Sequence, residues 1–346
     1  MKDEIKQINR YETLDWLRGL TALSIMLYHT YSFNFHSLNS SSFLGRLGIY
    51  GVSIFFVLSG LSMAIVYHSN FKKAKDILYF YFRRIMRIFP LFWLSFFLVM
   101  LLNRKVAPMQ EWIDNLFFVF GFDENETTVI PGGWSVGVEI YFYIFTPFII
   151  IAYSYKKWLG RLIIGILFFY GLRYAFLVFK DVTVLGAFWY NYVAPFNNFF
   201  LFGFGILLYY EFKDVKLSNQ ICFLGIILAC LLFVFYPAYG NQVYIVKGIN
   251  RIVFSFASIL LVLMFFLMKF QPPKWIVFPL QQFGIATYGV YLLHQLVQQF
   301  LHDYCYLTNP FLLMLATISI SIFFALFIYH YFEMPFIRLG KRKIFG

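Results

Sequence analysis

Long apolar runs separated by short polar connections follow one another along almost the whole chain. A bilayer-spanning helix needs about 20 mainly apolar residues, so these runs are candidates for membrane spans. The pattern predicts an all-α membrane protein, a bundle of about ten transmembrane helices forming a single domain over residues 1–346. The expected spans are 14–34, 49–67, 88–102, 134–153, 158–179, 195–211, 219–236, 251–270, 282–301 and 311–332. A shorter apolar patch at 116–122 is expected to be re-entrant or interfacial.

The composition excludes an ordinary soluble protein. Apolar residues make up 61% of the chain and charged residues 13%, whereas about 25% of a soluble domain is charged. So little polar surface cannot cover a water-facing globule. The three cysteines have neither metal-ligand spacing nor the pattern of a disulfide framework, and no metal is expected.

The basic residues predict the orientation of the chain in the membrane. Residues 1–13 lack the features of a secretory signal and are expected to stay inside. From that start, 20 of the 28 Lys and Arg residues fall in cytoplasmic segments and six on the opposite side. This asymmetry predicts two cytoplasmic termini in the inner membrane. The net charge of +12 is then topological, and the expected partners include membrane lipids but no nucleic acid.

Two ionisable residues, Arg18 and His29, fall inside the first expected span, in L-D-W-L-R-G-L-T-A-L-S-I-M-L-Y-H-T. A charge within a span costs at least about 2.5–3.5 kcal/mol on insertion scales, so each is a functional candidate by default. Eleven steps of about 100° make three turns plus about 20°, with a rise of about 16 Å, so both side chains are predicted on one helix face. For Arg173, also intramembrane, a structural ion pair and a functional role are equally open.

A basic cluster precedes the third expected span, in F-Y-F-R-R-I-M-R-I-F-P-L-F-W. Arg84 and Arg87 are three residues apart and share a helix face, and Pro90 fixes the helix geometry where the chain enters lipid. Guanidinium groups bind phosphate bidentately and stay charged, so the pair suits a phosphate-bearing ligand. Arg83 suits that role or a positive-inside anchor that reaches the headgroups.

On the opposite side, the chain re-enters the membrane as G-G-W-S-V-G-V-E-I-Y-F-Y. Ser135 and Glu139 are four apart and share a helix face. Glu139 and His29 lie at similar depths, which predicts a pair in which the carboxylate orients and charges the imidazole. His294 lies in the outer half of the ninth expected span, as either a substrate contact or a packing residue.

Together these segments resemble the acyltransferase 3 family of multi-pass membrane enzymes, which O-acylate cell-surface carbohydrates. The resemblance rests on Arg18 with His29 and on five further segments, in family order between residues 14 and 336. They are R-R-I-M-R-I-F-P-L-F-W, G-V-S-I-F-F-V-L-S-G-L (51–61), W-S-V-G-V-E-I-Y-F-Y (134–143), Y-G-V-Y-L-L-H-Q (288–295) and Y-F-E-M-P-F (331–336).

The resemblance implies roles for some of these residues. His29 is implied as the catalytic base, Arg18 as its support or as a donor contact, and Glu139 as a functional acid. The paired arginines are implied near the acyl-CoA donor, and the expected donor contacts are Arg83, Arg84 and Arg87. The residues expected to contact the acceptor or the oxyanion are Trp134, Ser135, Tyr288 and His294.

Two departures from the family pattern stand out. Ser53 replaces a common acidic residue of the second-helix motif. The chain stops at Gly346 where many relatives carry a C-terminal hydrolase-like domain, so transfer is expected to be completed inside the bundle.

The resulting hypothesis is a membrane O-acyltransferase. Acyl-CoA, with acetyl-CoA as the commonest donor, places its phosphates on the arginines and its thioester near His29, which removes the proton of an acceptor hydroxyl. His29 as a covalent acyl carrier remains an alternative. The acceptor is a glycan or glycolipid of the cell envelope, or a secreted one, and no permanently bound cofactor is expected. The rival classes are a transporter or flippase of lipid-linked sugars and a non-catalytic acyl-CoA-binding relative.

Overall fold

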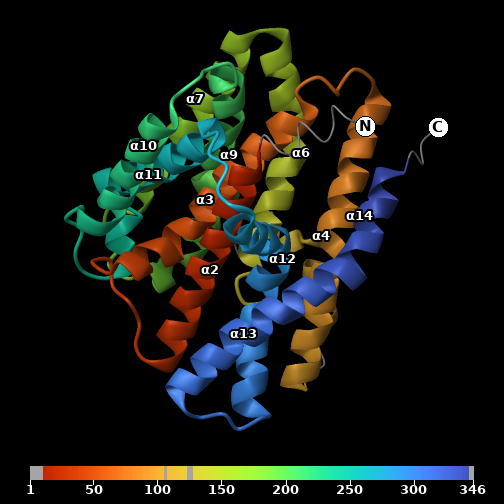
Figure 1. Ribbon diagram of the computed structural model, residues 1–346, viewed down its shortest axis with the longest axis vertical. Helices are drawn as coiled ribbons and strands as arrows, with labels where there is room; N and C mark the ends of the chain where they lie inside the picture. Colours follow the sequence, from red (N-terminus) through yellow and green to blue (C-terminus); the bar gives the residue numbers. More distant parts are fainter. Residues whose placement is uncertain (1–10, 105–106, 123–127, 343–346) are drawn as a thin grey trace.

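The computed structural model describes residues 11–104, 107–122 and 128–342, and over these residues the chain forms helices joined by short connections (Figure 1). The α-helices are α2 (Glu12–Asn34), α3 (Phe43–Tyr67), α4 (Ala74–Asn103), α5 (Met109–Phe117), α6 (Trp134–Tyr155), α7 (Lys157–Arg173), α8 (Trp189–Val193), α9 (Pro195–Phe212), α10 (Asn219–Phe235), α11 (Gly248–Leu267), α12 (Lys274–Asp303), α13 (Pro310–Ile328) and α14 (Met334–Lys341).

Each of the ten predicted apolar runs is helical, but fewer of the helices are long and apolar enough to cross a membrane. Within the described ranges, seven meet that criterion, or eight if α8 and α9, bent by 53° relative to each other, form one broken span. The helix α10 has only 17 residues. The expectation of about ten spans is therefore not confirmed, and the side on which each terminus lies stays a prediction. The patch at 116–122 forms the end of α5 and a short 3-10 turn.

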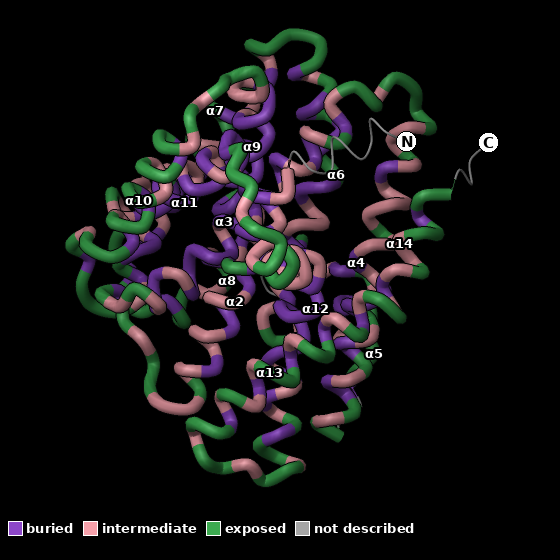
Figure 2. The backbone as a smooth tube through the Cα atoms, viewed as in Figure 1, coloured by how far each residue is buried: buried purple, intermediate pink, exposed green. Residues whose placement is uncertain are grey.

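The helices α3 and α9 pack closely at the centre of the bundle. A Cβ atom added to Gly60 would lie 2.0 Å from the carbonyl oxygen of Phe202, and one added to Gly205 would lie 2.1 Å from that of Val57. Only glycine permits this approach of two backbones. Figure 2 shows buried positions gathered along these central helices and exposed positions along the outer α10 and α13.

Several helices extend beyond the apolar runs that predicted them. The helix α4 begins at Ala74 and continues through Pro90, so Arg84 and Arg87 lie within a 30-residue helix rather than just before a span. The helices α13 and α14 are joined by a π-helical turn, Tyr329–Glu333. Pro335 has no N–H for the carbonyl four residues earlier, and the chain accommodates this with the wider turn.

Two of the six basic residues counted on the side opposite the termini, Arg46 and Arg251, are buried. Arg46 is 1% exposed, and its guanidinium donates to backbone carbonyls of Ser40 and of the segment 233–238 that ends α10. The carbonyls of Phe233 and Val234 lie in the last turn of α10 and have no partner within that helix, so Arg46 satisfies them. Arg251 is 3% exposed and donates to the carbonyl of Asn197. Arg46 therefore stabilises the backbone at and beyond the end of α10, and Arg251 ties α11 to the first turn of α9.

Candidate functional site

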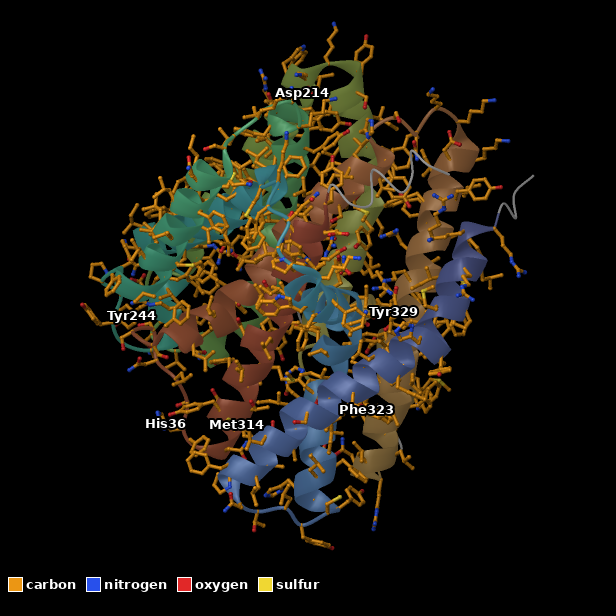
Figure 3. The ribbon with its side chains drawn as sticks, viewed as in Figure 1. His36, Asp214, Tyr244, Met314, Phe323 and Tyr329 are labelled. Atoms are coloured by element: carbon orange, nitrogen blue, oxygen red, sulfur yellow. The ribbon has the colours of Figure 1, made fainter. Side chains whose placement is uncertain are left out.

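A cavity of about 370 Å³ lies among five helices: α2, α3, α4, α6 and α12. Tyr329, from the π turn that follows α13, also lines the cavity. In Figure 3, Tyr329 lies near the middle of the long axis of the molecule, with Asp214 nearer one end and His36 nearer the other. Its charged and hydroxyl-bearing lining residues are Asp15, Arg18, Ser59, Ser62, Arg84, Arg87, Ser135, Glu139, Tyr143, Thr287, Tyr288, Tyr291 and Tyr329. The structure thus brings most of the predicted site residues into one chamber.

Arg18 is held at the wall of this cavity by two neighbours. Its guanidinium donates to the carboxylate of Asp15, one turn earlier on α2, and to the hydroxyl of Ser62 on α3. The pair with Asp15 is partly exposed, with 27% of the Arg18 side chain accessible. Arg18 is therefore oriented toward the chamber while its charge is largely balanced.

Arg84 and Arg87 both line the cavity, as expected from their spacing, but their environments differ. Arg87 forms an ion pair with Glu333 at 2.8 Å, and the Glu333 side chain is 2% exposed. Arg84 lies 5.8 Å from the ring centroids of both Tyr67 and Tyr143, and its terminal nitrogen is 3.4 Å from the Tyr67 hydroxyl. Within the described part of the chain, Arg84 makes no ion pair with a carboxylate.

Arg83 does not line the cavity. Its backbone packs toward α14, since a Cβ atom added to Gly340 would lie 3.5 Å from the Arg83 Cα atom. On a helix with about 100° per residue, Arg83 points about 100° from Arg84 but only about 40° from Arg87, so its exclusion from the cavity lining follows from this packing against α14 and not from the helical period. The structure therefore separates Arg83 from the other two arginines.

Glu139 lies in the cavity with its carboxylate engaged by hydroxyl groups. Ser59 of α3 donates to it, and Tyr143, one turn later on α6, donates to the same oxygen at 2.5 Å. Among the described residues, Glu139 makes no hydrogen bond to His29, so the predicted His29–Glu139 pair is not formed. Counting residues from the membrane boundary predicted the depth of the two groups, but it did not specify on which side of each helix they lie.

His29 instead packs against His294. The centroids of the two imidazole rings are 5.4 Å apart, with the ring planes inclined by 35°. His29 is half-buried and does not line the cavity. His294 lies three residues beyond the cavity residue Tyr291 on α12, about 4.5 Å along the helix axis, so the two histidines lie about one turn past that end of the chamber.

A second cavity, of about 210 Å³, lies beside the first and has an aromatic lining. Its wall includes Trp134 and Trp189, whose rings are 6.0 Å apart, together with Gly132. The Tyr291 hydroxyl donates to the Gly132 carbonyl at 2.8 Å and lies 2.8 Å from the Ser135 hydroxyl. Since Ser135 and Tyr291 line the first cavity, one thin hydrogen-bonded wall separates the two spaces.

Two further predicted residues have clear positions. The Tyr288 hydroxyl donates to the backbone carbonyl of Ile88 at 2.8 Å, which ties α12 to α4 at the cavity wall. Arg173 is exposed at the end of α7, away from both cavities. It forms no ion pair within the described ranges, so the structure gives it no link to the site.

Sequence reasoning did not single out several residues of the chamber. Glu333 is the clearest, because it is the only acidic residue between 304 and 346 and follows a long apolar run, so the cost of an intramembrane charge could have identified it. The hydroxyls of Ser59, Ser62 and Tyr143 carry no such signal. Serine and tyrosine are common in apolar helices, and only the packing shows that these three contact charged groups.

The arrangement combines an anion site with groups able to move a proton. Three guanidinium groups face two carboxylates in the cavity, and Arg84 keeps its charge without a carboxylate partner. At one end, the histidine pair supplies imidazole nitrogens that can accept or donate a proton. The described part of the chain contains no cluster of residues that could hold a metal ion. The site therefore suits group transfer from an anionic donor.

Comparison with known proteins gives a family match over most of the chain. A family model described as "Acyltransferase domain" matches residues 11–330. The "Putative acetyltransferase ORF330" of Acidianus two-tailed virus is 26% identical over 311 residues, covering 87% of this chain and 87% of the relative. The "Putative O-acetyltransferase SACOL0978" of Staphylococcus aureus (strain COL) is 25% identical over 397 residues, covering 98% of this chain but 59% of the relative. No solved structure matches.

Proposed function

We propose a donor and an acceptor for this chain, which belongs to the acyltransferase 3 family and is an acyltransferase of non-aminoacyl groups. The donor is acyl-CoA, with acetyl-CoA as the first candidate. The acceptor is a hydroxyl of a cell-envelope or secreted glycan or glycolipid. Transfer would take place in the cytoplasmic membrane, with the donor entering from the cytoplasm. The names of the relatives support an acetyl group and an oxygen acceptor.

The observation that carries the donor assignment is the Arg84 guanidinium. It faces the chamber, stacks near two tyrosine rings and lacks a carboxylate partner within the described residues. A cation held in this way favours an anionic ligand, and guanidinium groups bind phosphate oxygens bidentately. Arg18 and Arg87 add positive charge on neighbouring walls, although each already pairs with a carboxylate.

The second cavity supports the acceptor assignment. Indole and phenol rings offer flat apolar faces with a polar edge, which suits a ring that is apolar on its faces and carries hydroxyls around it. Trp134 and Trp189 provide such faces, and neither indole N–H has a hydrogen-bond partner among the described residues. An acceptor held there would lie across one wall from the donor, with Ser135 and Tyr291 between them.

In the proposed reaction, His29 takes the proton of the acceptor hydroxyl as the oxygen attacks the thioester carbonyl. A C–O bond forms, the C–S bond breaks, and the imidazolium returns its proton to the departing thiolate, giving the ester and free CoA. Ser135, on the wall between the two cavities, is the proposed hydroxyl donor for the transient oxyanion. Because the histidines lie one turn past the chamber, the acyl end of the donor must extend to that end.

The test measures CoA binding and turnover in purified protein reconstituted in nanodiscs. Arg84→Ala is expected to weaken CoA binding about 10- to 150-fold, which corresponds to the loss of one charge-assisted hydrogen bond of about 1.5–3 kcal/mol. The matched control is Arg161→Ala, which removes an exposed arginine far from both cavities and should leave the affinity within about twofold. Unchanged CoA affinity in Arg84→Ala would refute the donor assignment.

Turnover is measured as release of the CoA thiol from acetyl-CoA with a panel of methyl glycosides. The proposal expects thiol release that depends on a glycoside and is lost in His29→Ala, while CoA binding persists. Binding without glycoside-dependent release would indicate a non-catalytic acyl-CoA-binding protein. Neither binding nor release would favour a transporter or flippase.

A further inference from the structure

The pair of histidines contains an unusual buried group. His294 is 1% exposed, its Nδ1 lies 2.9 Å from the Val290 carbonyl oxygen, and its Nε2 is buried without a hydrogen-bond partner in the described structure. A buried polar atom left without a partner costs free energy, so it marks either strain or a function.

The contact with Val290 determines which nitrogen of His294 carries the proton. A carbonyl oxygen can only accept a hydrogen bond, so Nδ1 must be the N–H and the neutral ring must keep its lone pair on Nε2. The ring that faces His294 is His29 on α2, at a centroid distance of 5.4 Å. Two imidazoles at this separation can bring facing nitrogens to about 3 Å, a hydrogen-bond distance.

We propose that His294 is the positioning residue of the proposed base: its Nε2 accepts an N–H hydrogen bond from His29 when His29 becomes protonated during transfer. The inference rests on the proposed function. It gives His294 the role that the sequence had predicted for Glu139, whose carboxylate is instead engaged by Ser59 and Tyr143. The Nε2 acceptor is unused in the resting structure, and the N–H of His29 that faces it becomes a stronger, charge-assisted donor when the other nitrogen takes a proton and the imidazolium forms.

This arrangement has a catalytic consequence. A hydrogen bond that strengthens only when His29 gains a proton stabilises the transition state more than the ground state, so it should raise kcat without changing donor binding. It also directs one nitrogen of His29 toward His294 and leaves the other free to take the acceptor proton. The Tyr28 ring, 5.0 Å from the His29 ring on the same helix, limits the other orientations of the imidazole.

The test compares two substitutions of similar size that retain different halves of the imidazole. His294→Asn keeps an amide near the position of Nδ1 and can still bond the Val290 carbonyl, but it leaves no acceptor at the position of Nε2. His294→Gln reaches the position of Nε2 and can present an amide oxygen there. We expect His294→Asn to lower kcat about 10- to 100-fold with an unchanged KM for acetyl-CoA, and His294→Gln to recover most of that loss.

His302→Gln is the control, because it removes an exposed histidine at the end of α12 whose contacts are its neighbour Asp303 and the ring of Phe33, outside both cavities. A His294→Asn enzyme with wild-type kcat would overturn the inference. So would equal losses in both His294 variants together with a raised KM, because that result indicates a purely structural role.

A second measurement does not require turnover. The chain has only six histidines, so selective ¹⁵N labelling in nanodiscs gives few signals, which the His29→Ala and His294→Asn variants assign. When the pair takes up a single proton as the pH is lowered, we expect a correlation across a hydrogen bond between the two rings, with Nε2 of His294 as one of its two nitrogens. That correlation with no glycoside-dependent turnover would count against the proposed function and not against the pairing, whereas its absence in an active enzyme would overturn the pairing.

Discussion

The ion pair between Arg87 and Glu333 predicts that loss of Arg87 destabilises the protein, because the partner Glu333 is buried. Glu333 is 2% exposed and its other carboxylate oxygen has no partner in the described structure, whereas 31% of the Arg87 side chain is exposed. Arg87→Ala should therefore strand a buried carboxylate. Removing one member of a buried ion pair costs about 3–5 kcal/mol of the free energy of unfolding. Because Arg87 is partly exposed, we expect a smaller cost here, of about 2–3 kcal/mol.

The second substitution, Glu333→Gln, should partly rescue the first. In the Arg87→Ala background it replaces the stranded charge with a neutral amide and should recover about 1–2 kcal/mol of the free energy of unfolding. Globular proteins of this length lose about 1–2 °C per kcal/mol, so we expect a drop of about 2–5 °C for Arg87→Ala and a return of about 1–3 °C in the double variant. Wild type, both single variants and the double variant are compared by thermal unfolding in one detergent.

A double variant no more stable than Arg87→Ala, or an Arg87→Ala variant that unfolds at the wild-type temperature, would refute the predicted cost of the stranded carboxylate. The same proteins separate two roles of Arg87. If the stabilised double variant still binds CoA weakly, Arg87 contacts the donor directly. If its affinity returns to that of wild type, the effect of Arg87→Ala on the donor acts through the stranded carboxylate.

Three further predictions concern the packing, the chamber and the second cavity. Gly60→Ala should lower the unfolding temperature markedly and impair expression, because its Cβ would lie 2.0 Å from the Phe202 carbonyl oxygen and force α3 away from α9. Gly165→Ala is the control and should fold normally in the same assay, because its Cβ meets nothing within 4 Å. Tyr143→Phe should lower kcat severalfold and change stability by about 1 kcal/mol, since Ser59 still donates to Glu139; full activity would show that this hydroxyl has no part in the chemistry. Trp189→Ala should raise KM for the glycoside while CoA affinity stays constant, and an unchanged KM would remove the second cavity from the acceptor path.

Much of the helical architecture could be predicted from the sequence because lipid imposes a simple rule. Backbone groups inside a bilayer must bond within the segment, so a long apolar run has to be helical, and the ten runs identified are helical in the structure. The ends were less accurate. Hydropathy does not report that α4 continues to Ala74 through charged residues, and the number of spans depends on lengths and bends such as that between α8 and α9.

The cost of charge in an apolar run also identified much of the site. Arg18 and Glu139 were selected on this ground, and both line the central cavity together with the paired Arg84 and Arg87. Arg83, expected beside them as a donor contact, does not line the cavity.

The sequence by itself thus determined which segments are helical and which polar groups are held within them, because these properties depend on local hydropathy and the helical period. Only the tertiary structure decided which groups are partners. Arg87 finds Glu333 at a separation of 246 residues, Glu139 finds Ser59 at 80, and His29 faces His294 rather than Glu139. Depth along a helix follows from counting residues, but the azimuth of one helix against another is set by side-chain packing over the whole bundle.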